Sequence, residues 1–281
     1  MTHNTLHKSP SVQMVRRPAV AGYFYPADPA ALRERVDRLT QTSEMRHPAH
    51  AVIVPHGSYR HAGAIAGAVY GQVTIPRRCI LLGPSHTGTW MPWSLMMAGA
   101  YRTPLGDVPI DEACAHALQV RCPFLEADAW SQRGEHAIEV QLPFLQRLGP
   151  PDLTVVPIVT SSNDPAVLAQ LATALAQVMR MQEEPVLLIA TSDFSHYERQ
   201  AVVVERDRAL LDTITQLDRV AFSRQVQADG VVMCGDSVVA CVLEAARQLG
   251  AHKARVIRYG TSADAGGDPD SAIGYAGVII T

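Results

Sequence analysis

The chain has 281 residues, of which 47% are hydrophobic and 18% charged, and its formal net charge is −3. This composition supplies enough apolar side chains for a substantial hydrophobic core. It excludes the strongly basic surface typical of nucleic-acid binding and the highly charged, weakly hydrophobic composition of a disordered protein.

Strand-like and helix-like patterns alternate along the chain after a polar start. Residues 1–14 are polar and unpatterned, so we predict a flexible tail there and one domain over residues 15–281. The first predicted helix, at 30–40, has Asp28 as its cap and Pro29 in its first turn. Further helices are expected at 62–71, 135–149 (distorted at Pro143), 164–182, 208–217 and 236–250.

Short apolar runs rich in Val, Ile and Leu lie between these helices. They predict buried strands at 51–55, 79–83, 153–159, 186–190, 254–260 and 272–280. Strands that alternate with helices indicate an α/β fold, here a single domain with a largely parallel or mixed central sheet flanked by helices. Runs without polar residues, such as VLLIA, are typical of strands covered on both faces.

Histidines follow three of the predicted strands. AVIVP is followed by His56, CILLG by Pro84-Ser85-His86, and VLLIA by a segment that contains Asp193 and His196. Ligands of open α/β sheets bind beyond the carboxyl ends of the strands. If these strands are parallel neighbours, two or three imidazoles and a carboxylate share one small volume.

Cys234 precedes a glycine and the start of the predicted helix at 236–250. A helix N-terminus lowers the pKa of a thiol, and a thiolate is a good ligand for a soft metal ion. With His56 and His86, Cys234 would complete a site of two histidines and one anion with open positions. Simpler interpretations stay open, because each histidine also suits a hydrogen-bonded turn, Cys234 a small apolar filler and Asp193 a helix cap near Phe194.

The sequence also bears on where the protein works. No run approaches the roughly 20 apolar residues of a membrane-spanning helix. The opening MTHNTLHKSP lacks the apolar segment of a signal peptide, and the five cysteines have no paired spacing. We therefore predict a cytoplasmic protein with reduced thiols and with neither a membrane nor a nucleic acid as partner.

Seven blocks, in order, resemble the bacterial and archaeal branch of the MEMO family. They are RPAVAGYFYPADP, IVPHGSYRHAG, LLGPSH, GEHAIEVQLPFL, TSDFSHY, CGDSVVACVLEAA and YGTSADAGGDPDSAIGYAGVI. The family fold is similar to that of the class III extradiol dioxygenases, which use non-haem iron(II). The resemblance implies an oxidoreductase-like site that binds iron(II), or else copper or zinc, and an unidentified small-molecule substrate.

The resemblance also implies individual roles for residues of this site. His56, His86 and Cys234 would be the metal ligands, with Cys234 in place of the glutamate of the dioxygenases. His196 would be an acid/base residue with Asp193 beside it, and the resemblance places His136 in the same cavity. It further suggests an AMMECR-type protein and a radical SAM enzyme as partners.

The chain departs from the family pattern after the first histidine, where it reads Gly57-Ser58-Tyr59-Arg60-His61. His61 is an additional imidazole, which we interpret as a pocket or helix-surface residue rather than a further ligand. Asp264 suits either the pocket or a turn. Two other functions stay open, namely a metal-handling protein without turnover and a module that binds a peptide in the cleft.

Overall fold

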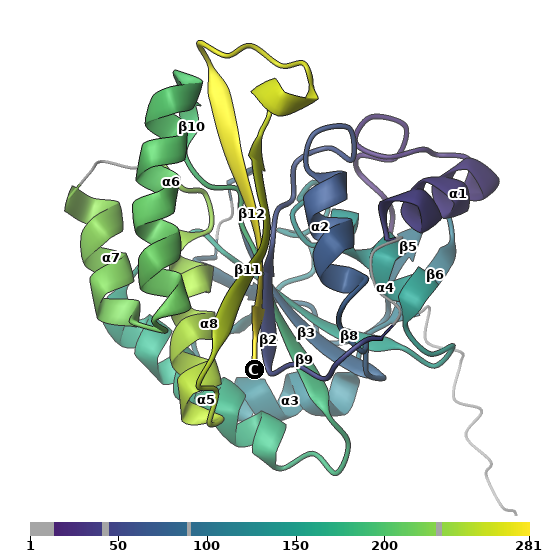
Figure 1. The fold of residues 1–281 in the computed structure, drawn as a ribbon. Coiled ribbons are helices and arrows are strands. Elements are labelled where there is room, and N and C mark those ends of the chain that lie inside the picture. The colour runs from purple at the N-terminus through teal and green to yellow at the C-terminus, as the bar shows by residue number, and fades with distance from the viewer. Residues whose placement is uncertain (1–13, 41–44, 89–90, 229–231) are drawn as a thin grey trace, which may run out of the picture.

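Four parallel strands form the centre of a nine-stranded sheet in the computed structural model, which describes residues 14–40, 45–88, 91–228 and 232–281 (Figure 1). In spatial order they are β2 (Ala51–Val54), β9 (Val186–Thr191), β3 (Arg78–Pro84) and β8 (Thr154–Thr160). Antiparallel strands extend both sides, β12 (Ala272–Ile280) beside β2 and β4 (Trp93–Leu95) beside β8. The remaining strands are β10 (His196–Glu198) and β11 (Ala254–Thr261), which pair with β12, and β7 (Glu126–Ala127), which pairs with β4.

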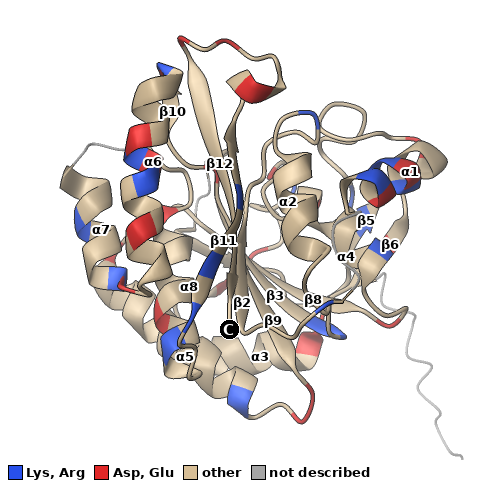
Figure 2. Ribbon diagram, in the orientation of Figure 1, with Lys and Arg blue, Asp and Glu red and all other residues tan. Residues whose placement is uncertain are grey.

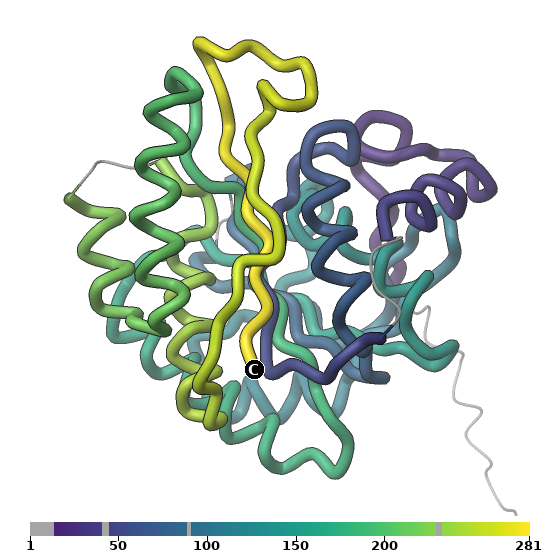
Figure 3. The backbone as a smooth tube through the Cα atoms, in the orientation of Figure 1, coloured from purple at the N-terminus to yellow at the C-terminus, as the bar shows by residue number. Residues whose placement is uncertain are grey.

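Helices cover both faces of this sheet, as the ribbon and the backbone tube show (Figures 1 and 3). One face carries α3 (Glu112–Arg121), α5 (Pro165–Arg180), α6 (Gln200–Thr215), α7 (Arg219–Ala228) and α8 (Asp236–Gln248). The other carries α1 (Pro29–Leu39), α2 (Gly63–Tyr70) and α4 (Leu142–Leu148), together with a small sheet of β1 (Val15–Arg16), β5 (Ala100–Thr103) and β6 (Gly106–Pro109).

The central strands are buried on both faces and divide their side chains between two hydrophobic clusters. In β2, Ala51 and Ile53 pack toward α5 and α8, whereas Val52 and Val54 pack toward α1 and α2. This division follows from the alternation of side chains along a strand. It explains why the strands are continuous apolar runs, and it confirms the predicted α/β fold with a mixed sheet flanked by helices.

Some predicted elements have different bounds in the structure. The helix expected over 135–149 is wrong in its first turns, because a 3-10 turn, η1 (Glu139–Gln141), precedes α4 and Pro143 lies in the first turn of α4. Proline needs no backbone donor there. Sequence patterns did not predict α3, α7 or the β5–β6 hairpin.

Two further predictions concern the N-terminal tail and membrane-spanning helices. The tail predicted at 1–14 lies outside the described residues except for Met14. Among the described residues, no helix combines the length and apolar character needed to cross a membrane.

Candidate metal centre

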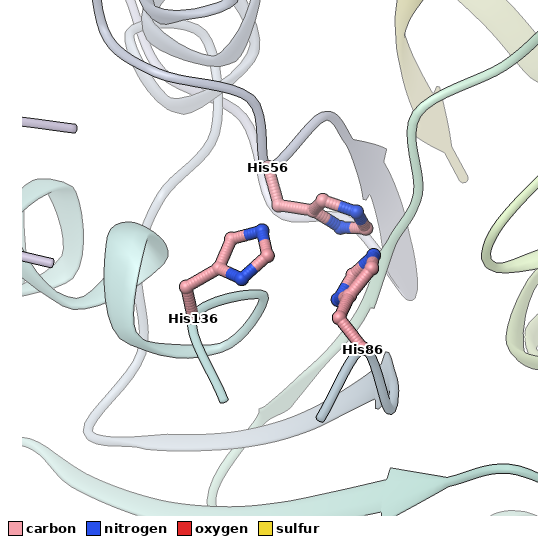
Figure 4. A group of neighbouring side chains, drawn as sticks. All are labelled: His56, His86 and His136. Atoms are coloured by element: carbon pink, nitrogen blue, oxygen red, sulfur yellow. The ribbon is translucent and has the colours of Figure 1, made fainter. Parts of the chain in front are cut away.

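Three histidine rings converge just beyond the carboxyl ends of the parallel strands (Figure 4). His56 follows β2, His86 follows β3, and His136 precedes η1. One nitrogen from each ring lies within 4.8 Å of the corresponding nitrogens of the other two. The ring centroids of His86 and His136 are 4.5 Å apart, and those of His56 and His86 are 4.9 Å apart. The prediction that the strand ends bring His56 and His86 together is therefore confirmed.

The carboxylate of Glu135 orients two of these rings. Glu135 Oε1 accepts a hydrogen bond of 3.0 Å from His86 Nδ1 and lies 3.4 Å from His136 Nδ1. Oε1 also accepts hydrogen bonds from the backbone N–H groups of His136 and Ala137, and Oε2 accepts one from the backbone N–H of His86. Because Nδ1 of both rings faces Glu135, the Nε2 atoms remain for a ligand.

Thr191, the last residue of β9, orients His56 in the same way. Its hydroxyl oxygen lies 3.0 Å from His56 Nδ1 and accepts a hydrogen bond from the amide of Gln141. The opposite ring nitrogen, Nε2, lies 3.1 Å from Cys234 Sγ. A protein group therefore faces Nδ1 of each of the three rings, and such partners fix the tautomer and orientation of metal-binding histidines.

The ionisation of the cluster differs between its members. Burial lowers the pKa of His56, and its neighbours His86 and His136 add to this effect, so the His56 ring is neutral near pH 7. Burial acts to raise the pKa of Glu135, but the hydrogen bonds and charge of His86 outweigh it and hold the pKa at about 2. Burial likewise opposes protonation of His86, yet the bond to Glu135 raises its pKa overall.

This donor set fits a transition metal ion. Neutral imidazoles suit zinc, copper, iron and nickel, and the anion Glu135 behind the rings would raise their basicity. Ligand nitrogens around one metal ion lie about 3–4 Å apart. Ion binding would therefore draw the rings slightly together from their present separations.

Cys234 adjoins this group through His56. Its sulfur accepts a hydrogen bond of 3.3 Å from the backbone N–H of Asp193. The expectation of a lowered thiol pKa is wrong, because burial and the negative charge of Asp193 raise the pKa of Cys234. The thiol is therefore protonated in the absence of a metal. The ligand set His56, His86 and Cys234 stays a prediction, and His136 is a further candidate ligand.

Asp193 contacts His56 instead of capping a helix. No helix begins near Phe194, because the chain continues into β10 and α6 starts at Gln200. Asp193 Oδ1 accepts hydrogen bonds from the backbone N–H groups of His56 and Gly57, at 2.8 and 3.1 Å. Burial raises the pKa of this carboxyl despite these bonds. Asp193 therefore fixes the backbone that carries His56.

His196 has a defined orientation outside the group of three. Its Nδ1 lies 2.8 Å from the carbonyl oxygen of Val232, which can only accept a hydrogen bond. In the neutral ring, Nδ1 therefore carries the proton and Nε2 carries the lone pair. This is the tautomer that the predicted role of a base requires.

The other residues singled out by sequence have local roles. Among the described residues, His61 is not part of the group formed by His56, His86 and His136. Its Nδ1 lies 3.1 Å from the Ser58 hydroxyl. Asp264 accepts hydrogen bonds from the backbone and hydroxyl of Thr261, as the turn interpretation expected. Sequence reasoning missed Glu135 and Thr191. Their only signal was position, since Glu135 immediately precedes His136 and Thr191 ends a buried strand.

The sheet and the histidine group at its strand ends make this an α/β protein with a candidate metal site. Comparison with known proteins identifies its family. A family model described as Memo-like protein matches residues 16–279, and the chain belongs to that family. MEMO1 family proteins of Methanopyrus kandleri and Aquifex aeolicus are each 34% identical to it. Both alignments cover 95% of this chain and 99% of the relative.

A solved structure supports the fold. The crystal structure of an uncharacterised protein from Escherichia coli K12 aligns with a TM-score of 0.55 and 16% identity, over 82% of this chain and 99% of that one.

Acidic and basic residues are interspersed on helices such as α1 and α6 (Figure 2). This distribution agrees with the near-neutral net charge.

Proposed function

We propose that this protein binds a transition metal ion at the histidine cluster and acts as a metal-dependent oxidoreductase on a small molecule. The observation that carries the proposal is the convergence of three ring nitrogens within 4.8 Å. Each ring comes from a different segment, and Glu135 or Thr191 orients its other nitrogen. Iron(II) is the proposed ion, with copper and zinc as alternatives, and when bound it would supply Lewis-acid and redox chemistry.

The protein groups around the cluster have separate tasks in this proposal. His56, His86 and either His136 or Cys234 would hold the ion. His196 would accept a proton at Nε2 from a substrate hydroxyl, because Nδ1–H is held by the Val232 carbonyl. Asp193 would keep the His56 backbone in place through its two hydrogen bonds.

Oxygen consumption by wild type and His196→Ala tests the catalytic part. The proposal predicts that His196→Ala keeps its iron content and loses oxygen uptake with a catechol panel. The pH profile of the oxygen uptake is measured as well, because loss of a base changes that profile. Equal uptake by both proteins would refute the role of His196 as base.

A second candidate is metal handling without turnover, and the position of Cys234 favours it. A sulfur 3.1 Å from His56 Nε2 offers a soft ligand, which suits copper(I) or zinc better than iron(II). This candidate predicts tight copper(I) binding and no oxygen consumption with any substrate. The predicted AMMECR-type and radical SAM partners fit either candidate and stay predictions, as does a peptide-binding role.

A further inference from the structure

Tyr275 differs from the other tyrosines that the fold encloses. Tyrosine hydroxyls normally find a hydrogen-bond partner when they are buried. Five other tyrosine hydroxyls do so here. Tyr25 donates to Glu139, Tyr59 to Val140, Tyr70 to Gln141, Tyr101 to Gln132 and Tyr259 to Asp207. Tyr275 is only 3% exposed, yet its hydroxyl has no partner among the described residues.

The hydroxyl of Tyr275 lies beside the backbone that carries His56. A Cβ atom at Gly57 would be 3.2 Å from this hydroxyl and 3.0 Å from ring atom Cε1. Gly57 is bonded through its N–H to Asp193, which also holds the His56 N–H. The hydroxyl therefore lies against the residue that follows His56, close enough to Asp193 to feel its charge.

The fold holds the Tyr275 ring in this place. The ring belongs to a small hydrophobic cluster with Ala62 and Ile65, at the start of α2. Its backbone is paired with Gly260 of β11. The hydroxyl oxygen is also absent from the fully enclosed unsatisfied polar atoms of the described residues, so it keeps a small accessible surface. A rigid ring thus presents an accessible donor without a protein acceptor.

The charge state of Tyr275 suits a donor. Burial, together with the negative charge of Asp193, raises the pKa of this phenol. The hydroxyl is therefore protonated at any physiological pH. A proton donor that the protein leaves unused is then available to a molecule that enters the site.

We propose that Tyr275 contacts the ligand of the metal centre and donates its hydroxyl hydrogen to an oxygen atom of that ligand. The inference rests on the proposed function, because it places the ligand beside the histidine cluster. The ligand class that fits is a small molecule with an anionic or carbonyl oxygen next to its metal-binding atom. A hydrogen bond to a charged oxygen strengthens binding by about ten- to a hundredfold.

The test uses the iron(II)-loaded protein without oxygen, with 4-nitrocatechol as the probe and its absorbance as the readout. Wild type, Tyr275→Phe and Tyr23→Phe are compared, because Tyr23 is 86% exposed and serves as the matched control. The inference predicts equal iron content in all three and probe binding weakened at least about tenfold in Tyr275→Phe alone. The phenyl ring keeps its packing, so the variant should fold.

The outcomes separate this inference from the proposed function. Absence of iron binding in the wild type would refute the proposed metal site. Normal iron binding with equal probe affinity in wild type and Tyr275→Phe would refute the role of Tyr275 and leave the metal site standing. Iron binding without any probe binding in the wild type would also contradict an accessible ligand position beside this hydroxyl.

Discussion

Glu135 accepts two hydrogen bonds from His86, one from the backbone N–H and one from Nδ1 of the ring. The two contacts fix the position of the residue and the rotation of its ring at once. Because Glu135 is 1% exposed and its pKa is held at about 2, the anion persists over the whole physiological range. The direction of His86 Nε2 is thus set before any ion binds.

Removing the charge of Glu135 should weaken metal binding. We expect Glu135→Gln to lower the affinity for iron(II) or zinc by about 10–100-fold, since outer partners of ligating histidines have effects of this size. Isothermal titration calorimetry measures the affinity. Glu126→Gln is the matched control, because Glu126 is exposed on β7. Unchanged affinity in Glu135→Gln would mean that His86 is not a ligand.

Substitution of single ligands should decide between His136 and Cys234. If sulfur is the third ligand, Cys234→Ser weakens metal binding far more than His136→Ala, and the reverse holds for a three-histidine site. Cys241→Ser is the control, because Cys241 on α8 is 1% exposed in the core and its substitution should affect folding only. Equal losses of affinity in both cysteine variants would show that the effect of Cys234 is structural.

The buried pair Arg16 and Glu139 should dominate the stability of the N-terminal segment. Arg16 bonds Glu139 and the carbonyl groups of Gln132 and Glu135, so it joins β1 to the loop that carries His136. Loss of one member leaves a buried charge unpaired, and we expect Arg16→Met to cost about 3–5 kcal/mol of unfolding free energy.

Urea denaturation measures the cost of Arg16→Met. The exposed pair of Arg38 and Glu34 provides the control, and Arg38→Met should leave the unfolding midpoint unchanged. Equal midpoints in both variants would show that the buried pair adds no net stability.

Asp207 should make stability depend on pH. It accepts hydrogen bonds from Ser195 and Tyr259, but burial outweighs them and raises its pKa above 3.8. The folded protein therefore binds this proton more tightly than the unfolded chain, and the stability from that proton falls as pH rises from 3.8 through the raised pKa.

Asp207→Asn removes this titration while keeping the shape of the side chain. Denaturation at several pH values should show that the stability of the wild type, relative to the variant, declines with rising pH. A constant difference between the two proteins would contradict a raised pKa of Asp207.

Sequence patterns predicted the sheet better than the details of the site. Apolar runs such as VLLIA predicted the strands, because burial on both faces leaves no place for polar residues. The helix expected from Glu135 was wrong in its first turns, because the Glu135 carboxylate accepts the backbone N–H groups of His136 and Ala137 and a 3-10 turn follows. No local pattern could reveal that the Tyr275 side chain lies against Gly57, because the two residues are 218 positions apart in the sequence.

The charge of Cys234 was the other failure. The rule that a helix N-terminus lowers a thiol pKa describes one interaction correctly. Burial and Asp193, which comes from a distant segment, raise the thiol pKa here. Long-range electrostatics of this kind depend on the fold and so escape sequence reasoning.

Metal content is the most direct test of the metal centre. The wild type would be purified without tags or chelators under anaerobic conditions, beside His56→Ala/His86→Ala, and both analysed for iron, copper and zinc. We predict near-stoichiometric metal in the wild type and its loss in the variant, with circular dichroism showing that both proteins are folded. A wild type that stays free of metal after reconstitution, or a variant that retains the same amount, would contradict the account.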